Sequence, residues 1–267
     1  MKIANKLLIS LLALLTLTTC SRDWNNPFDA EDSSPAGSFY VLSSDGDGDF
    51  MTTGLAPALQ ILGDVTVEAW VNINSIPETG FAQIVIQSAN GELEKDNALF
   101  NLAITSDSKV DAFHESGAGL NHAVITQGTI PIRTWIHLAV VRDTNAKTYE
   151  IFINGLSDTK MGYSNNPTGG TSSEFKVSFG FDGLIDEVRI WRKTRTEAQI
   201  KATMSDTLGP QYYLRADSSL AGYWRFDPVE NLGVGSDGLV DDIRDLSVNG
   251  NHGDLVGEAA ILRLTSR

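Results

Sequence analysis

Short runs in which apolar and polar residues alternate begin at about Gly37, and turn residues separate them. In the run 65–73 every second residue is apolar, and these residues would share one face: Val65, Val67, Ala69, Val71 and Ile73. Because successive side chains of a β-strand point to opposite sides, this pattern predicts strands with one buried face. Four further runs behave similarly: 83–87, 98–105, 135–142 and 149–154.

One of these runs indicates a two-layer structure. Residues 135–141 are apolar on both faces except for His137, as expected for a central strand that is covered on both sides. Asn154-Gly155, at the end of the run 149–154, is a strong signal for a tight turn. Many short strands with regular turns predict an all-β fold, an antiparallel two-sheet sandwich or jelly roll.

A short helix is predicted at 196–204, between strand-like runs. Thr196 and Gln199 have the spacing of a capping box, which satisfies backbone N–H groups at the start of a helix. The buried side of this helix would consist of Ile200, Thr203 and Met204. The run 220–226 then predicts another strand, and the Gly- and Asp-rich segment 227–253 predicts mostly turns.

The first nineteen residues have the features of an export signal. Lys2 and Lys6 precede the apolar run 7–17, which is far shorter than the roughly 20 residues that a membrane-spanning helix needs. Cys20 follows directly, and this arrangement resembles the lipobox of bacterial lipoproteins. The resemblance implies cleavage before Cys20 and lipidation of its thiol; the alternative is an ordinary secretory signal with an incidental cysteine.

The residues beside Cys20 refine this prediction. Thr19 stands where lipoproteins usually carry Gly, Ala or Ser. Ser21, rather than Asp, favours sorting to the outer membrane of a host that has one, by analogy with known lipoproteins. Residues 20–36 are polar, without the period of helix or strand, and are expected to form a tether from the membrane.

Charge and cysteine content exclude several classes of partner and site. The chain of 267 residues has 20 Lys and Arg against 34 Asp and Glu, a formal charge of −14. Nucleic acid is therefore excluded as an expected partner, since binding a phosphate backbone rests on clustered cations. The single cysteine excludes an intramolecular disulfide and a cysteine-based zinc site.

Four motifs, taken together and in this order, give a more specific signal. They lie at 45–50 (DGDGDF), 65–71 (VTVEAWV), 134–140 (TWIHLAV) followed by 151–155 (IFING), and 181–191 (FDGLIDEVRIW). In this order they resemble the laminin-G-like group of concanavalin A-like jelly rolls, to which the pentraxins are related. The resemblance covers most of residues 37–257 and implies a two-sheet jelly roll.

The end of the chain leaves two interpretations open. Residues 222–227 and 245–253 resemble a companion motif that usually opens a domain of this group. Residues 207–267 therefore either close this domain or begin a truncated second copy. A remainder of about 60 residues would struggle to bury its own core, so we favour one domain over 37–267.

An acidic loop raises the question of calcium. Asp45, Asp47 and Asp49 alternate with glycines at a spacing that is typical of oxygen-rich calcium loops. The resemblance implies a structural calcium ion between such an early loop and a late strand. We therefore expect that calcium, if bound, involves Asp45 together with Asp186.

Two consecutive carboxylates in a strand-like run need partners. Alternation predicts that Asp186 and Glu187 point to opposite faces, and a buried carboxylate costs several kcal/mol unless it is paired. Arg189, two residues after Glu187, is the expected partner on the same face. A purely structural role for these carboxylates is the alternative to metal binding.

Catalytic signatures are missing from the sequence. Jelly-roll glucanases carry paired carboxylates in a Glu-x-Asp-x-x-Glu strand, and no such string occurs in this chain. The sequence also contains no Gly-x-Ser-x-Gly elbow, phosphate-binding loop or histidine pair with metal-binding spacing. We therefore expect a protein that binds a ligand without transforming it.

Three long, polar segments would carry the ligand site: 76–97, 111–121 and 157–173. Within them, flat apolar faces could come from Phe81, Phe113 and Tyr163, and paired hydrogen-bonding groups from Asn90, Asn121 and Asn165. His114 is expected in the exposed loop 111–121 and His122 directly after it, where both could contact a ligand. The acidic surface favours neutral glycans or a basic protein face over anionic polysaccharides.

The sequence thus predicts a lipid-anchored recognition protein of the cell envelope that binds carbohydrate or protein. Two alternatives remain: a structural or scaffolding lipoprotein without a small ligand, and an enzyme that acts on polysaccharide.

Overall fold

The computed structural model describes the following residues: 39–88, 98–116, 121–168, 174–205, 208, 218–226 and 242–265. The predictions for Cys20, for its tether and for Asn90 concern residues outside these ranges. In the part of the chain that is described, no helix is both long and apolar enough to cross a membrane.

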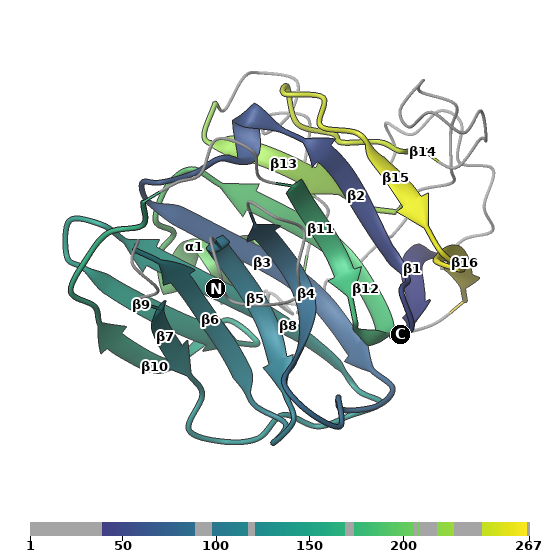
Figure 1. The fold of residues 1–267 in the computed structure, drawn as a ribbon, viewed down its shortest axis with the longest axis horizontal. Coiled ribbons are helices and arrows are strands. Elements are labelled where there is room, and N and C mark those ends of the chain that lie inside the picture. The colour runs from purple at the N-terminus through teal and green to yellow at the C-terminus, as the bar shows by residue number, and fades with distance from the viewer. Residues whose placement is uncertain are drawn as a thin grey trace, which may run out of the picture.

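Two antiparallel sheets lie face to face, with sheet B nearer the viewer in Figure 1. Sheet A has the order β10 (Leu156–Gly162), β9 (Thr148–Ile153), β8 (Trp135–Asp143), β3 (Val65–Ile73), β12 (Asp182–Trp191), β1 (Phe39–Asp45) and β16 (Ala260–Leu264), and β13 (Leu220–Trp224) also pairs with β12. Sheet B has the order β14 (Asp242–Ile243), β15 (Gly253–Val256), β2 (Phe50–Leu55), β11 (Glu174–Phe179), β4 (Phe81–Ser88), β5 (Ala98–Thr105), β6 (Val110–Glu115) and β7 (Asn121–Ile125). The predicted all-β jelly-roll sandwich is confirmed.

The core lies between the sheets and follows the predicted alternation. The apolar face of β3 is completely buried, and it packs in one cluster with residues of sheet B such as Phe100 and Val177. Across the layers, the rings of Phe175 and Trp224 stack at 5.0 Å between centroids. Burial of this apolar surface is the main force that holds the two sheets together.

Helix α1 (Glu197–Thr203) covers the outer face of sheet A. Thr196 and Gln199 form the predicted capping box. Ile200 packs on Ala139 and Phe152, which explains why β8 is apolar on both sides. Within the tight turn after β9, Asn154 and Gly155 have φ angles of 50° and 75°, as its sequence predicts.

Strand β12 contains a β-bulge where it changes neighbours. Its first half pairs with β1 and its second half with β13, and the register against β3 shifts between Asp186 and Arg189. Glu187 has a φ of 55°. Its side chain and that of Arg189 are hydrogen-bonded to each other on the outer face of sheet A. Asp186 lies opposite Trp70 on that same face, so the prediction that Asp186 and Glu187 point to opposite faces is wrong.

The C-terminal strands add to both sheets. β13 pairs with β12, β15 with β2, and β16 with β1, so the yellow strands lie beside the purple ones in Figure 1. Asp245 fixes the turn that follows β14, because its carboxylate accepts hydrogen bonds from the N–H groups of Tyr223, Ser247 and Asn251. The 245–253 motif is thereby attached to β13.

Segment 111–121 differs from its prediction. Residues 111–115 belong to strand β6, where Phe113 and His114 are both fully buried. The prediction of an exposed loop is therefore wrong for this part of the segment. Pairing with β5 and β7 provides the hydrogen bonds that the local sequence does not reveal.

Candidate functional site

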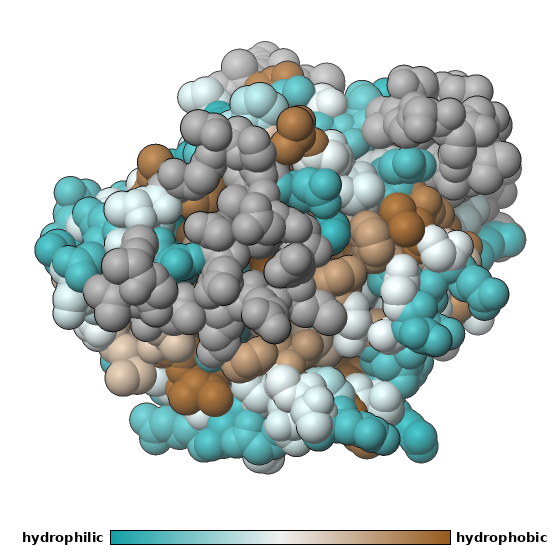
Figure 2. Space-filling view, viewed as in Figure 1, coloured by the Kyte–Doolittle hydropathy of each residue, from teal (hydrophilic) through white to brown (hydrophobic). Residues whose placement is uncertain are grey.

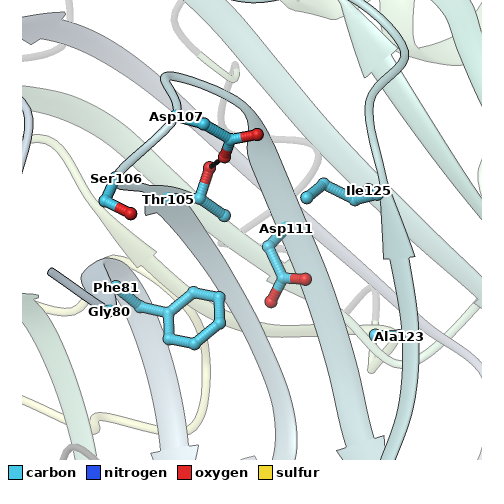
Figure 3. A pocket seen from close by; sticks show the side chains of 8 residues that line it. All are labelled: Gly80, Phe81, Thr105, Ser106, Asp107, Asp111, Ala123 and Ile125. Carbon is cyan, nitrogen blue, oxygen red and sulfur yellow. Dashed lines mark hydrogen bonds between the residues drawn. The ribbon is translucent and has the colours of Figure 1, made fainter.

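A pocket of about 460 Å³ opens on the outer face of sheet B, the face turned away from sheet A. We call it the sheet B pocket. The residues that line it come from four strands, from the bend before β4 and from the turn between β5 and β6: Gly80, Phe81, Thr105, Ser106, Asp107, Asp111, Ala123 and Ile125 (Figure 3). Figure 2, viewed from this side, shows apolar residues in brown among hydrophilic residues in teal.

Strand alternation places these side chains outside the core. Phe81 lies opposite Thr105, and Asp111 lies opposite Ile125. Their neighbours along the chain point the other way, into the core: Ala82, Ile104, Val110, Ala112 and Val124. Most of the pocket is therefore built on strands of the sheet, and only Gly80, Ser106 and Asp107 come from the segments that connect them.

The pocket combines an aromatic wall with acidic groups. In Figure 3 the carboxylate of Asp111 points toward the side of the pocket where the ring of Phe81 lies. Asp111 is only 3% exposed. Ile125, which is 39% exposed, forms an apolar rim on the opposite side.

Asp107 is ionised at neutral pH. Its carboxylate accepts a hydrogen bond of 2.5 Å from the hydroxyl of Thr105, and this bond is the main cause that lowers the pKa of Asp107. The ammonium group of Lys109, 3.5 Å away, lowers it further. The mouth of the pocket therefore carries negative charge.

A pair of amides lies next to the pocket on the same face. Nδ2 of Asn101 donates to Oε1 of Gln83 (3.1 Å), and Oδ1 of Asn101 accepts from the N–H of Phe113 (2.7 Å). Nε2 of Gln83 is buried and has no hydrogen-bond partner among the described residues. A buried donor without a partner costs about 1–3 kcal/mol, which makes this amide an unusual feature of the sheet.

The far half of the sheet B face carries a buried cation. Nζ of Lys176 lies 4.8 Å from the ring centroid of Phe50 and 4.5 Å from that of Phe179. It also forms an ion pair of 3.4 Å with Glu174. These contacts hold the ammonium group between two aromatic rings and a carboxylate.

A second hollow, of about 320 Å³, lies on the outer face of sheet A beside α1, and we call it the sheet A groove. Its polar groups largely satisfy one another: Glu150 forms an ion pair of 2.9 Å with Lys160 and accepts a hydrogen bond of 2.6 Å from Ser157. Phe152 and Val141 contribute its apolar lining.

The predicted calcium ligands do not come together. Asp45 lies opposite Asp182 in the register of β1 and β12, not opposite Asp186, so the pairing of Asp45 with Asp186 is wrong. Oδ1 of Asp186 instead accepts the N–H of Glu187 at 2.7 Å, within the bulge. Glu187 pairs with Arg189 at 2.5 Å, as the sequence predicts.

The carboxylates of the acidic loop accept backbone hydrogen bonds. Asp45 accepts from the N–H of Asp47 (2.8 Å), and Asp49 accepts from the N–H groups of Asp45 (3.3 Å) and Glu258 (2.6 Å). Within the described ranges, no three His, Cys, Asp or Glu side chains are grouped so that they could hold a metal ion. Calcium binding by the acidic loop itself stays a prediction.

The predicted aromatic residues have different positions. Phe81 lies in the sheet B pocket, but Phe113 is buried in β6 with its ring 6.5 Å from that of Phe81, so it cannot present a flat face to a ligand. Tyr163 packs edge-on against His114 at 4.8 Å, and its hydroxyl donates to the backbone of Asp143 (3.1 Å). Tyr163 is therefore part of the packing at one end of the sandwich.

Two of the predicted asparagines, Asn121 and Asn165, lie in the described part of the chain. The backbone oxygen of Asn165 accepts a hydrogen bond of 2.8 Å from Nε2 of His114, and its side chain is exposed. Asn121 begins β7, opposite Glu115. Thr105, Asp111 and Gln83 are not among the predicted site residues, although they stand at the polar positions of alternating runs.

The sequence of this chain matches a known protein family. The family described as "Concanavalin A-like lectin/glucanases superfamily" matches residues 44–201. A search of curated proteins finds no match. Members of this superfamily include both lectins and glucanases, so membership does not decide between binding and catalysis.

Solved structures share the fold at low identity. A Bacteroides ovatus protein to which carbohydrate binding has been ascribed has a TM-score of 0.59 and 19% identity over 88% of this chain, and the chain spans 62% of that protein's length. A CBM40 domain of the Ruminococcus gnavus IT-sialidase, bound to sialyllactose, has a TM-score of 0.49 and 14% identity, over 62% of this chain and 96% of that one. A SAP-like pentraxin of Limulus polyphemus has a TM-score of 0.49 and 14% identity, over 85% of this chain and 95% of that one.

The family match extends over more than half of the residues, and the two facing antiparallel sheets have the corresponding architecture. The chain belongs to the concanavalin A-like lectin/glucanase superfamily.

Proposed function

We propose that this chain binds carbohydrate in the sheet B pocket and does not transform it. The observation that carries the proposal is the lining of the pocket, where the ring of Phe81 faces hydroxyl and carboxylate groups on rigid strands. The apolar C–H face of a pyranose packs on an aromatic ring, while its hydroxyl groups need hydrogen-bond acceptors and donors. The similar fold of the Bacteroides ovatus protein agrees with this proposal.

A purely binding role is supported by the charge state of Asp107. Hydrolysis of a glycosidic bond needs two carboxyl groups, one of which must be protonated to act as the general acid. The hydrogen bond from Thr105 lowers the pKa of Asp107, whose side chain is 61% exposed, so Asp107 is unsuited to that role. Sugar release by the pure protein that is lost on replacing Asp107 or Asp111 with Asn would contradict the non-catalytic role.

The pocket should be the place where sugars are held. On a glycan array, Phe81→Ala in the full chain should weaken glycan binding about tenfold, because the pocket loses its aromatic wall. Ile125→Ala should also weaken glycan binding, because the pocket loses an apolar wall. Ile132→Ala is the matched control for Ile125→Ala, since Ile132 is 43% exposed and does not line the pocket. Equal loss in the Ile125 and Ile132 variants would argue against this site. An array on which no glycan binds would favour the scaffolding alternative.

We further propose that the protein is a lipoprotein of the cell envelope, anchored through Cys20 and, in a host with two membranes, sorted to the outer one. The support is the sequence, in which an apolar export segment is followed directly by the only cysteine. Cys20→Ala should move the protein from the membrane fraction to the soluble fraction, because acyl chains provide the membrane affinity. A Cys20→Ala protein that remains with the membrane would refute lipid anchoring.

A further inference from the structure

Gln83 on β4 carries a buried hydrogen-bond donor that the described part of the chain does not use. Its side chain is fully buried, and its Nε2 has no hydrogen-bond partner there. The neighbours fix the orientation of this amide. Oδ1 of Asn101 accepts from the backbone N–H of Phe113, which can only donate, so Nδ2 of Asn101 faces Gln83. The atom of Gln83 that accepts from Asn101 is therefore Oε1, and Nε2 is left as a donor.

Strand register places this donor beside the sheet B pocket. Gln83 follows Phe81 by two residues on β4, so the two side chains share the outer face of the sheet. Across the strands, Gln83 lies in one row with Ala103, Asp111 and Ile125. The last two line the pocket, and Ala103 presents only a methyl group between them and Gln83.

The ring of Phe81 lies across this row. Its centroid is 6.5 Å from that of Phe113 on β6, although β5 separates β4 from β6. The ring therefore leans over β5 at Ala103, next to Gln83. Phe81 itself is part-exposed and lines the pocket, as Figure 3 shows.

The chemistry of this position fits an oxygen that only accepts, bonded to a small apolar group. A carbonyl oxygen accepts without donating, whereas a hydroxyl group brings a hydrogen that needs an acceptor of its own. Phe81, Ala123 and Ile125 offer apolar surface to a methyl group. The acetamido group of an N-acetylated sugar combines both features. A carboxylate also only accepts, but the formal charge of −14 on the chain disfavours an anionic ligand.

We propose that the sheet B pocket prefers N-acetylated hexosamines, and that Gln83 determines this preference by donating from Nε2 to the acetyl carbonyl. The ring of Phe81 turns away from Ala103 when the ligand enters, since Gln83 is otherwise covered, and then packs on the sugar ring. Side chains at binding sites commonly change rotamer on binding. This inference rests on the proposed carbohydrate-binding function and names its ligand class.

The test compares two trisaccharides by calorimetric titration of the full chain. Triacetylchitotriose and cellotriose have the same backbone, and cellotriose has a hydroxyl group in place of each acetamido group. Triacetylchitotriose should bind at least about tenfold tighter, because only its carbonyl gives the buried donor a partner without adding another donor. Equal affinities, or tighter binding of cellotriose, would overturn the preference and leave carbohydrate binding intact.

The side-chain amide of Gln83 reports the contact directly in the unmodified protein. Its N–H signals, assigned by triple-resonance nuclear magnetic resonance, should shift during titration with triacetylchitotriose and stay unchanged with cellotriose. Unchanged Gln83 signals while triacetylchitotriose binds would refute the role of this residue, whether or not a variant folds.

A variant locates the preference. Gln83→Met removes the donor and keeps the length of the side chain, so it should remove most of the preference while cellotriose still binds. Gln87→Met is the matched control, because Gln87 is equally buried on the same strand but lies opposite Phe100 of the core. An unchanged preference in folded Gln83→Met protein would overturn the proposal. An array on which no glycan binds would overturn both this inference and the function on which it rests.

Discussion

Replacing Glu68 with Gln is expected to lower the free energy of unfolding by about 3–5 kcal/mol, because it breaks a buried ion-pair network. Glu68 lies on β3 beneath α1 and is fully buried. Its Oε1 accepts a hydrogen bond of 2.7 Å from Nε1 of Trp191 and lies 3.2 Å from Nε of Arg195. Its other carboxylate oxygen, Oε2, lies 3.5 Å from Nε2 of His137. The neutral amide leaves the buried guanidinium of Arg195 without this carboxylate.

The loss should depend on pH. Burial raises the pKa of Glu68, but the hydrogen bond with His137 and the charges of Arg195 and Arg189 outweigh burial, so the pKa lies below its ordinary value of 4.5. A carboxyl whose pKa is lower in the folded state stabilises the fold above the unfolded pKa, and this contribution is lost as the pH falls through the folded pKa. The stabilities of the wild type and Glu68→Gln should therefore converge as the solution is acidified.

Urea unfolding at a series of pH values measures both effects. Glu197→Gln is the matched control, because Glu197 makes an exposed pair with Lys201 on α1 and exposed pairs contribute little. A Glu68→Gln protein as stable as the control at neutral pH would show that the network does not stabilise the fold. A difference from wild type that stays constant with pH would refute the ionised state of Glu68.

Gly183→Ala is expected to cost about 3 kcal/mol, because there is no room for a methyl group at this position of β12. A Cβ on Gly183 would overlap the backbone oxygen of Asn72 on β3 and would lie 2.8 Å from Cε1 of Phe181. The oxygen belongs to the backbone of the adjacent strand, so it can move away only if β3 and β12 separate. The thermal midpoint should fall by several degrees, at roughly 2–4 °C per kcal/mol.

Gly128→Ala is the control for this substitution. No heavy atom lies within 4 Å of a Cβ at Gly128, and its φ is not in the left-handed region. Its melting temperature should stay close to that of the wild type. Equal melting temperatures for the two variants would mean that the contact of β12 with β3 at Asn72 is looser than described.

The elements with strong local signals could be predicted from the sequence. Strand 65–73 and the capping box of Thr196 with Gln199 are such cases, because alternation and capping are properties of neighbouring residues. The turn at Asn154-Gly155 is another, since the two residues tolerate positive φ at little cost. For these elements the tertiary structure agrees with the local preference.

Features that depend on long-range pairing could not be predicted. The bulge at Glu187 places a non-glycine residue at positive φ, and its cause is the change of neighbour from β1 to β13. The partner of Asp45 is set by strand register, which made Asp182 rather than Asp186 its neighbour. Strand β6 is not apparent from the sequence, because its pairing with β5 and β7 supplies the stability that its composition does not indicate.

The candidate site was only partly predictable for the same reason. The sequence predicts Phe81 as a loop aromatic, and Phe81 does line the pocket, but from the start of a strand. Asp111 and Thr105 come from the two strands of the β5–β6 hairpin, and only the pairing of β5 with β4 brings them beside Phe81. Alternation predicts which residues face outward, but not which strands are neighbours.

The location of a bound saccharide tests the central claim most directly. The full chain, with the methyl groups of Ala, Ile and Val labelled, is titrated with a saccharide selected on the array. Nuclear magnetic resonance then follows the methyl signals of Ala123 and Ile125 in the sheet B pocket and of Val141 in the sheet A groove. We expect the signals of Ala123 and Ile125 to shift with saccharide concentration while that of Val141 stays unchanged. A shift of Val141 with no change at Ala123 and Ile125 would contradict the assignment of the sheet B pocket as the carbohydrate site.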